Sequence, residues 1–118
     1  MSLQQEIVGD LIDIENDLGN PTFTWNGSTY NFIPSVAEFN RMLETGGFQL
    51  VRELKATVRL WDIADDGSLQ SVFNGIVPQP QQKFTYSIDG VTYRIGIIRP
   101  DPTNSYFRII AYSVTKGV

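Results

Sequence analysis

A cluster of carboxylates is the first feature of the sequence that could support chemistry. Three acids within residues 62–66 precede Gly67, and carboxylates ahead of a glycine can wrap a hard cation such as Ca²⁺. The third and twelfth positions of such a loop would be Ala64 and Phe73, and neither has a side-chain oxygen. We therefore predict a hairpin turn here and no metal site.

Two further patterns could serve an enzyme. Ser113 and Lys116 match the Ser-x-x-Lys pattern of acyl-transfer enzymes, which needs a helix to bring the two side chains to one face. On a strand this odd spacing sends them to opposite faces. Asp65 and Asp101 could act as paired carboxylates, but nothing in their spacing brings them together. Because histidine and cysteine are also absent, we expect no enzyme activity and no cofactor.

Composition indicates one β-rich domain spanning residues 1–118. A hydrophobic content of 42% in 118 residues suffices for an ordinary core. There is no apolar run of membrane-spanning length, and the N-terminus is acidic, so we expect neither a membrane span nor a secretory signal. The net charge is -4, and residues 1–20 hold five acids and no base. With its bases scattered, the chain lacks the basic patch typical of nucleic-acid binding.

The N-terminal segment, residues 1–19, is predicted to be an acidic helix. Ser2 and Gln5 can form a capping box, and Gly19 followed by Pro21 stops the helix. The spacing of its large apolar residues predicts one apolar stripe that packs on the rest of the protein, formed by Leu3, Ile7, Leu11, Ile14 and Leu18. Which face is buried stays open at this stage.

After the helix, the hydrophobic period changes to that of β-strands. Hairpins are expected in residues 22–32, about Asn26-Gly27, and in residues 83–98, about Asp89-Gly90. In the second hairpin, the alternating apolar residues are predicted to share one inward face; they are Phe84, Tyr86, Ile88, Val91, Tyr93, Ile95 and Ile97. Further strands are predicted in residues 50–61, 69–77 and 106–114. Residues 36–47 suggest a short helical turn followed by a glycine break, and the path of residues 36–50 stays open.

These elements predict an α+β, mainly β fold. The N-terminal helix precedes a body, residues 20–118, that forms a small antiparallel β-barrel or sandwich of about six strands. The helix is expected to cover an opening or an edge of that body.

The acidic helix is the most suggestive functional element. Its carboxylates form either a solvated outer face or a docking surface for basic residues of another copy, such as Arg52, Arg59, Arg94 or Arg108. Trp25 would join such a surface if it is partly exposed, and Gly46-Gly47 marks a loop where contacts often lie. The candidate partner interface therefore comprises Glu6, Asp10, Asp13, Glu15, Asp17, Trp25, Gly46 and Gly47.

The C-terminal half resembles a known family. Pro80, the run Phe84-Thr-Tyr-Ser-Ile-Asp-Gly-Val-Thr-Tyr-Arg-Ile-Gly-Ile-Ile, an acidic turn and Phe107-Arg-Ile-Ile-Ala-Tyr are similar to the small head-tail joining (head-completion or stopper) proteins of tailed bacteriophages. The segments Phe23-Thr-Trp-Asn-Gly-Ser-Thr-Tyr and Gly46-Gly47-Phe48 also resemble short proteins of prophage morphogenesis clusters, so that the likeness covers most of residues 20–114. The acidic helix has no match in the family pattern.

The resemblance implies a structural protein of a phage or prophage particle. It would form a ring of identical subunits between the portal side and the tail, with other phage structural proteins as partners. It would be found in the bacterial cytoplasm during assembly and then in the virion, without sequence-specific contact to nucleic acid and without a membrane. The alternative is a small open-barrel module that binds nucleic acid or a small ligand through Trp25, Tyr30 and Trp61.

Overall fold

The structure is a computed structural model that describes residues 2–42 and 48–113. One helix is followed by nine strands in this part of the chain. The elements are α1 (Leu3–Asp17), β1 (Thr22–Trp25), β2 (Ser28–Asn31), β3 (Ile33–Met42), β4 (Phe48–Arg59), β5 (Trp61–Ile63), β6 (Leu69–Ser71), β7 (Lys83–Tyr86), β8 (Thr92–Pro100) and β9 (Tyr106–Ser113).

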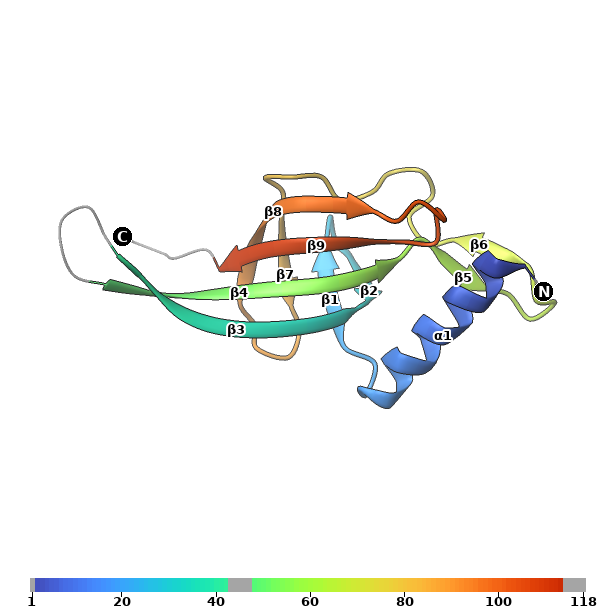
Figure 1. Ribbon diagram of the computed structural model, residues 1–118, viewed down its shortest axis with the longest axis horizontal. Helices are drawn as coiled ribbons and strands as arrows, with labels where there is room; N and C mark the ends of the chain where they lie inside the picture. The colour runs from blue at the N-terminus through green and yellow to red at the C-terminus, as the bar shows by residue number, and fades with distance from the viewer. Residues whose placement is uncertain (1, 43–47, 114–118) are drawn as a thin grey trace.

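Seven of these strands form one antiparallel sheet in the order β2-β1-β7-β8-β9-β4-β3. The sheet curls into a half-barrel, so β1, β2 and β7 run across the strands β3, β4, β8 and β9 (Figure 1). The other two strands, β5 and β6, form a separate hairpin beside α1. The α+β, mainly β fold with an N-terminal helix is therefore confirmed, as a curled sheet with two open edges.

Local sequence signals account for the helix and the first hairpin. Ser2 and Gln5 form the expected capping box of α1, with the Gln5 amide donating to the Ser2 hydroxyl at 3.1 Å. Asn26 and Gly27 both have positive φ angles, as a tight hairpin turn requires, and Phe23 pairs with Tyr30. None of the helices in the described ranges is long and apolar enough to cross a membrane.

The hairpin of β7 and β8 has the predicted core face but a longer turn. Residues 87–90 form the turn, because the Tyr86 amide bonds to the Val91 carbonyl and Asp89 accepts the Val91 amide at 2.8 Å. Ile88 therefore lies in the turn and is 70% exposed, so its predicted inward position is wrong.

A β-bulge between Ile95 and Ile97 reverses the face of the residues that follow. It turns Ile97 to the outer face, where it is 43% exposed, and places Ile98 against the core. The predicted inward position of Ile97 is therefore wrong.

The expected helical turn within residues 36–47 is also wrong where the structure describes it. Residues 33–42 form strand β3, which pairs along its whole length with β4. Ten cross-strand residue pairs outweigh a weak local helical preference. Residues 43–47, including the predicted glycine break, lie outside the described residues.

The core lies on the concave side of the half-barrel and is strongly aromatic. Phe23 and Phe32 are almost fully buried, and their ring centroids lie 4.8 Å apart. The remaining buried members are Trp25, Leu54, Ala56, Val58, Phe73, Phe84, Tyr86, Tyr93, Ile95, Phe107, Ile109 and Ala111. Tyr93 donates its hydroxyl to Asp89 at 2.7 Å, and burial together with this carboxylate raises the pKa of Tyr93.

The aromatic core predicts the effect of a large truncation. Replacing Phe32, which also contacts the rings of Phe84 and Tyr86, by alanine (Phe32→Ala) should lower the free energy of unfolding by about 3–5 kcal/mol. Urea unfolding measures the loss as a lower midpoint with an unchanged slope. The control Ile88→Ala removes an exposed side chain and should change stability by less than about 0.5 kcal/mol. Equal losses in both variants would contradict this description of the core.

Candidate protein interaction surface

Helix α1 does not bury the apolar stripe that its sequence predicts. Its two fully buried residues are Val8 and Glu15, which are 0% and 1% exposed. Leu3, Ile14 and Leu18 of the stripe are instead 64%, 44% and 50% exposed. At 3.6 residues per turn, the buried face is rotated about a quarter turn from the centre of the stripe. The face that the sequence left open is therefore the one with Val8 and Glu15, and the apolar stripe is only partly covered by the body.

An ion pair between Glu15 and Arg59 of β4 explains this rotation. The Arg59 Nε donates to Glu15 Oε2 at 2.6 Å, and Nη2 donates to Oε1 at 3.0 Å. The third nitrogen, Nη1, donates to the Trp61 carbonyl at 2.8 Å and to Asp62 Oδ1 at 3.3 Å. The side chains of Glu15 and Arg59 are 2% and 11% exposed, so their bidentate contact is formed away from water.

The electrostatics of the pair follow from its burial. Removal from water alone would lower the pKa of Arg59, but the hydrogen bonds and charge of Glu15, with the charge of Asp62, outweigh it and raise that pKa. The guanidinium therefore stays charged. An acid near the C-terminal end of a helix interacts unfavourably with the helix dipole. For Glu15, the ion pair with the buried Arg59 offsets this unfavourable interaction.

Side-chain amides fix the other end of α1. Gln4 Nε2 donates to the Asn104 carbonyl at 2.9 Å, in the loop between β8 and β9. Gln5 Nε2 donates to the Gly67 carbonyl at 2.9 Å, in the turn between β5 and β6. Trp61 Nε1 also donates to the Asn104 carbonyl, at 2.7 Å. The helix is thus held at both ends, and its rotation about its own axis is determined.

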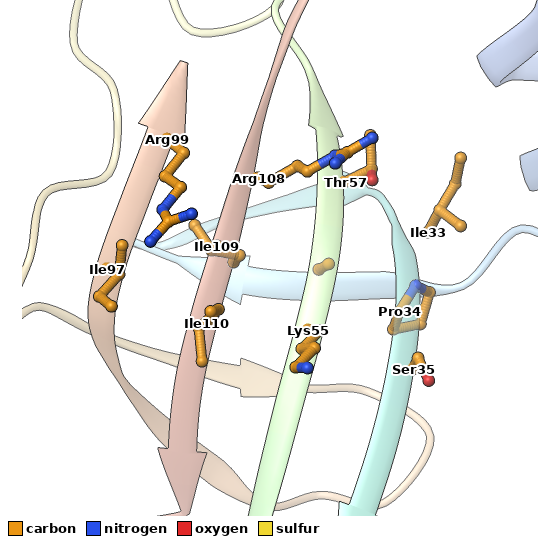
Figure 2. A pocket seen from close by; sticks show the side chains of 11 residues that line it. Ile33, Pro34, Ser35, Lys55, Thr57, Ile97, Arg99, Arg108, Ile109 and Ile110 are labelled. Atoms are coloured by element: carbon orange, nitrogen blue, oxygen red, sulfur yellow. The ribbon is translucent and has the colours of Figure 1, made fainter. Parts of the chain in front are cut away.

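The outer face of the sheet, opposite the core, carries a groove across β3, β4, β9 and β8. We name this the outer-face groove; it has a volume of about 470 Å³. Figure 2 shows its apolar and basic side chains on four neighbouring strands. The lining residues are Ile33, Pro34, Ser35, Lys55, Ala56, Thr57, Ile97, Arg99, Arg108, Ile109 and Ile110.

A second hollow, of about 390 Å³, lies between α1 and the sheet. Its helix wall includes Ile7 and Leu11 of the apolar stripe, and it shares Thr57 and Arg108 with the outer-face groove. Asp101 at its rim accepts hydrogen bonds from the hydroxyl and the amide of Thr103, and these bonds lower the pKa of Asp101. The partly open helix stripe and the sheet groove are therefore adjacent parts of one surface.

Exposed charges of opposite sign lie on this surface without forming ion pairs among the described residues, although the charge of Arg108 contributes to the lowered pKa of Asp101. Within residues 2–42 and 48–113, four exposed acids of α1 have no hydrogen-bond or ion-pair partner: Glu6, Asp10, Asp13 and Asp17. On the sheet, Arg99 and Arg108 are exposed and have no carboxylate within ion-pair distance in the same ranges. Arg108 lies over the ring of Tyr106, 5.8 Å from its centroid.

The structure separates the predicted interface residues into different groups. Glu6, Asp10, Asp13 and Asp17 lie on the exposed side of α1 and remain candidates. Gly46 and Gly47 lie outside the described residues. The predicted interface role of Glu15 and Trp25 is wrong, because both side chains are buried. Glu15 binds Arg59, and Trp25 is 6% exposed, with its Nε1 donating to the side chain of Gln82 at 3.1 Å.

The predicted basic partners divide in the same way. Arg59 pairs with Glu15 of its own chain, and Arg52 lies 3.5 Å from Asp89, whereas Arg94 and Arg108 are exposed on the outer face. The groove's apolar residues and Arg99 were not predicted as site residues. The alternation of β4 could have revealed Lys55, but the bulge that exposes Ile97 has no clear sequence signal.

The residues singled out as chemical candidates form no metal-binding cluster in the described ranges. No three His, Cys, Asp or Glu side chains in those ranges lie where they could hold a metal ion. In the predicted turn, Asp66 accepts the amide and hydroxyl of Ser68, and these hydrogen bonds lower the pKa of Asp66. Ser113 accepts the Arg52 amide at 3.0 Å in β9, whereas Lys116 lies outside the described residues.

No protein-family model matches the chain. A search of curated proteins finds no match either.

The Glu15–Arg59 pair predicts a large and asymmetric effect on stability. Arg59→Met leaves Glu15 buried without its partner, so the free energy of unfolding should fall by about 3–5 kcal/mol. Replacing both residues, Glu15→Leu with Arg59→Met, removes the unpaired charge and should restore most of that loss. Urea unfolding measures both changes.

The matched control is Asp17→Asn, which alters an exposed acid of the same helix and should change stability by less than about 0.5 kcal/mol. A loss below about 1 kcal/mol in Arg59→Met would mean that the pair behaves as a solvent-screened surface contact, and would contradict its role in fixing α1.

Proposed function

We propose that this chain is a non-enzymatic structural protein of a tailed phage or prophage particle, which joins the head to the tail through protein–protein contacts. The observation that carries the proposal is the adjacent pair of surfaces made by the exposed stripe of α1 and the outer-face groove. An exposed apolar surface rimmed by charge is typical of a protein interaction site.

The resemblance of the sequence to head-tail joining proteins supplies the particular setting. The residues that carry it, Phe84 to Ile98 and Phe107 to Tyr112, lie largely in β7, β8 and β9. The outward residues of β8 and β9 form part of the outer-face groove. The proposed partners are therefore other copies of the chain, a portal-side ring and a tail protein.

A ligand-binding module is less well supported. Trp25 is buried in the core, and Trp61 uses its ring nitrogen to hold the β8–β9 loop. Arg59, the base nearest in sequence to Trp61, is already bound by Glu15 and Asp62. The aromatic residues that such a module would need for stacking have structural roles instead.

The proposed function predicts a particular assembly defect. In the phage or prophage that encodes the chain, disrupting its gene should yield DNA-filled heads and separate tails instead of joined particles, because the connecting contact is missing. Electron microscopy counts the three species, and antibody detection should find the chain in purified complete particles. A plasmid copy of the intact gene is the control and should restore joined particles. Joined, infectious particles in its absence would contradict the proposal.

A further inference from the structure

The exposed part of the α1 stripe needs a partner that its own chain does not supply. Leu3 and Ile14 of α1, and Leu18 at its C-cap, are large apolar side chains that are exposed. They follow one side of a helix fifteen residues long, so the stripe extends over about 22 Å. The Glu15–Arg59 pair prevents α1 from turning this stripe inward, since burial of the stripe would pull Glu15 out of its contact.

The outer-face groove has the shape and composition to accept a helix. Its lining crosses β8, β9, β4 and β3, whose outer members lie about 14 Å apart at normal strand spacing. A helix with its side chains is about 10 Å across. Ile33, Ile97 and Ile110 supply apolar contact, and Figure 2 shows them at the two sides and in the middle of the four-strand surface.

Charge complementarity identifies the helix that fits. The acids Asp10 and Asp17 flank the exposed stripe of α1, and neither side chain forms a hydrogen bond or ion pair among the described residues, although Asp10 lines the second hollow together with Arg108 of its own chain. Lys55, Arg99 and Arg108 flank the apolar floor of the groove. An apolar stripe with an acidic border therefore matches an apolar floor with a basic border.

We propose that the outer-face groove binds α1 of a second copy of this chain. In this contact, Ile14 and Leu18 of one copy pack on the isoleucines of the groove, and Asp10 and Asp17 meet Arg99 and Arg108. The inference deepens the proposed function, on which it rests for the particle in which the contact is used. Both surfaces lie on the same chain, so a second copy supplies the matching partner without any other protein.

The first experiment removes the apolar part of the contact. Light scattering over a concentration series should show that the intact chain self-associates. Ile14→Gln with Leu18→Gln should weaken this association by about 100-fold, because the two apolar side chains that the proposal places in the contact lose their burial there. Since both positions are exposed, urea unfolding of the separated chain should be unchanged.

The matched control is Ile76→Gln with Ile88→Gln. These side chains are 68% and 70% exposed in loops and belong to neither surface, so association should remain as in the intact chain. An intact chain that stays monomeric throughout the series overturns the inference. So does equal weakening by the control, which would indicate nonspecific apolar contact.

The second experiment exchanges the charges. Arg99→Glu with Arg108→Glu should weaken self-association by more than about tenfold, and so should Asp10→Arg with Asp17→Arg, because like charges then face each other. In a mixture of the two variants, the helix of the first and the groove of the second keep their native opposite charges, and the groove of the first and the helix of the second carry exchanged opposite charges, so a mixed complex should form. Mass measurement with one variant carrying a tag detects it. Undiminished self-association of either variant, or failure of the mixture to form a mixed complex, overturns the inference.

These outcomes are separable from those of the proposed function. If the purified chain self-associates through α1 and the groove but gene disruption leaves joined phage particles, the interface stands and the phage function fails. If disruption separates heads from tails but the purified chain is monomeric, the function stands and this interface fails.

Discussion

The buried pair of Glu15 and Arg59 determines how the rest of the molecule is arranged. It joins residues 44 positions apart and ties the last turn of α1 to the end of β4. Without it, the apolar stripe of α1 would be the natural face to pack on the sheet. With it, a charged residue takes the buried position, and the largest apolar side chains of the helix are left at the surface. A buried ion pair often adds little net stability, so its effect here lies in specifying one orientation.

The orientation of α1 gives the outer face of the sheet its importance. The core lies on the concave side, and its aromatic cluster stabilises the curled sheet. The opposite side carries basic and aliphatic side chains from three strands, Lys55 of β4, Ile97 and Arg99 of β8 and Arg108 and Ile110 of β9, beside the polar Thr57. Helix α1 covers one end of this face and leaves the groove open. The fold therefore presents an apolar helix stripe with an acidic border beside an apolar groove floor with a basic border.

Local signals in the sequence predicted local structure well. The capping box of α1, the Asn26-Gly27 turn and the inward faces of Phe84 and Tyr93 depend on neighbouring residues and are confirmed. The rotation of α1 was not predictable, because it depends on a partner 44 residues away that no periodicity records. Strand β3 was missed for a similar reason: its pairing with β4 overrode a local pattern. The groove depends on a bulge and on four strands brought together by the sheet order, and neither has a local signal. The sequence therefore predicted the acids of α1 as interface residues, but only part of the basic border of the groove.

The most direct test of the central claim, that the outward stripe of α1 meets the groove of another copy, is intermolecular cross-linking through single cysteines. The chain has no native cysteine, so Ile14→Cys and Ile110→Cys each introduce one reactive site. A mixture of the two variants treated with a short bifunctional maleimide should give mainly mixed dimers, whereas Ile88→Cys mixed with Ile110→Cys should give few. Equal cross-linking in the two mixtures would contradict the claim.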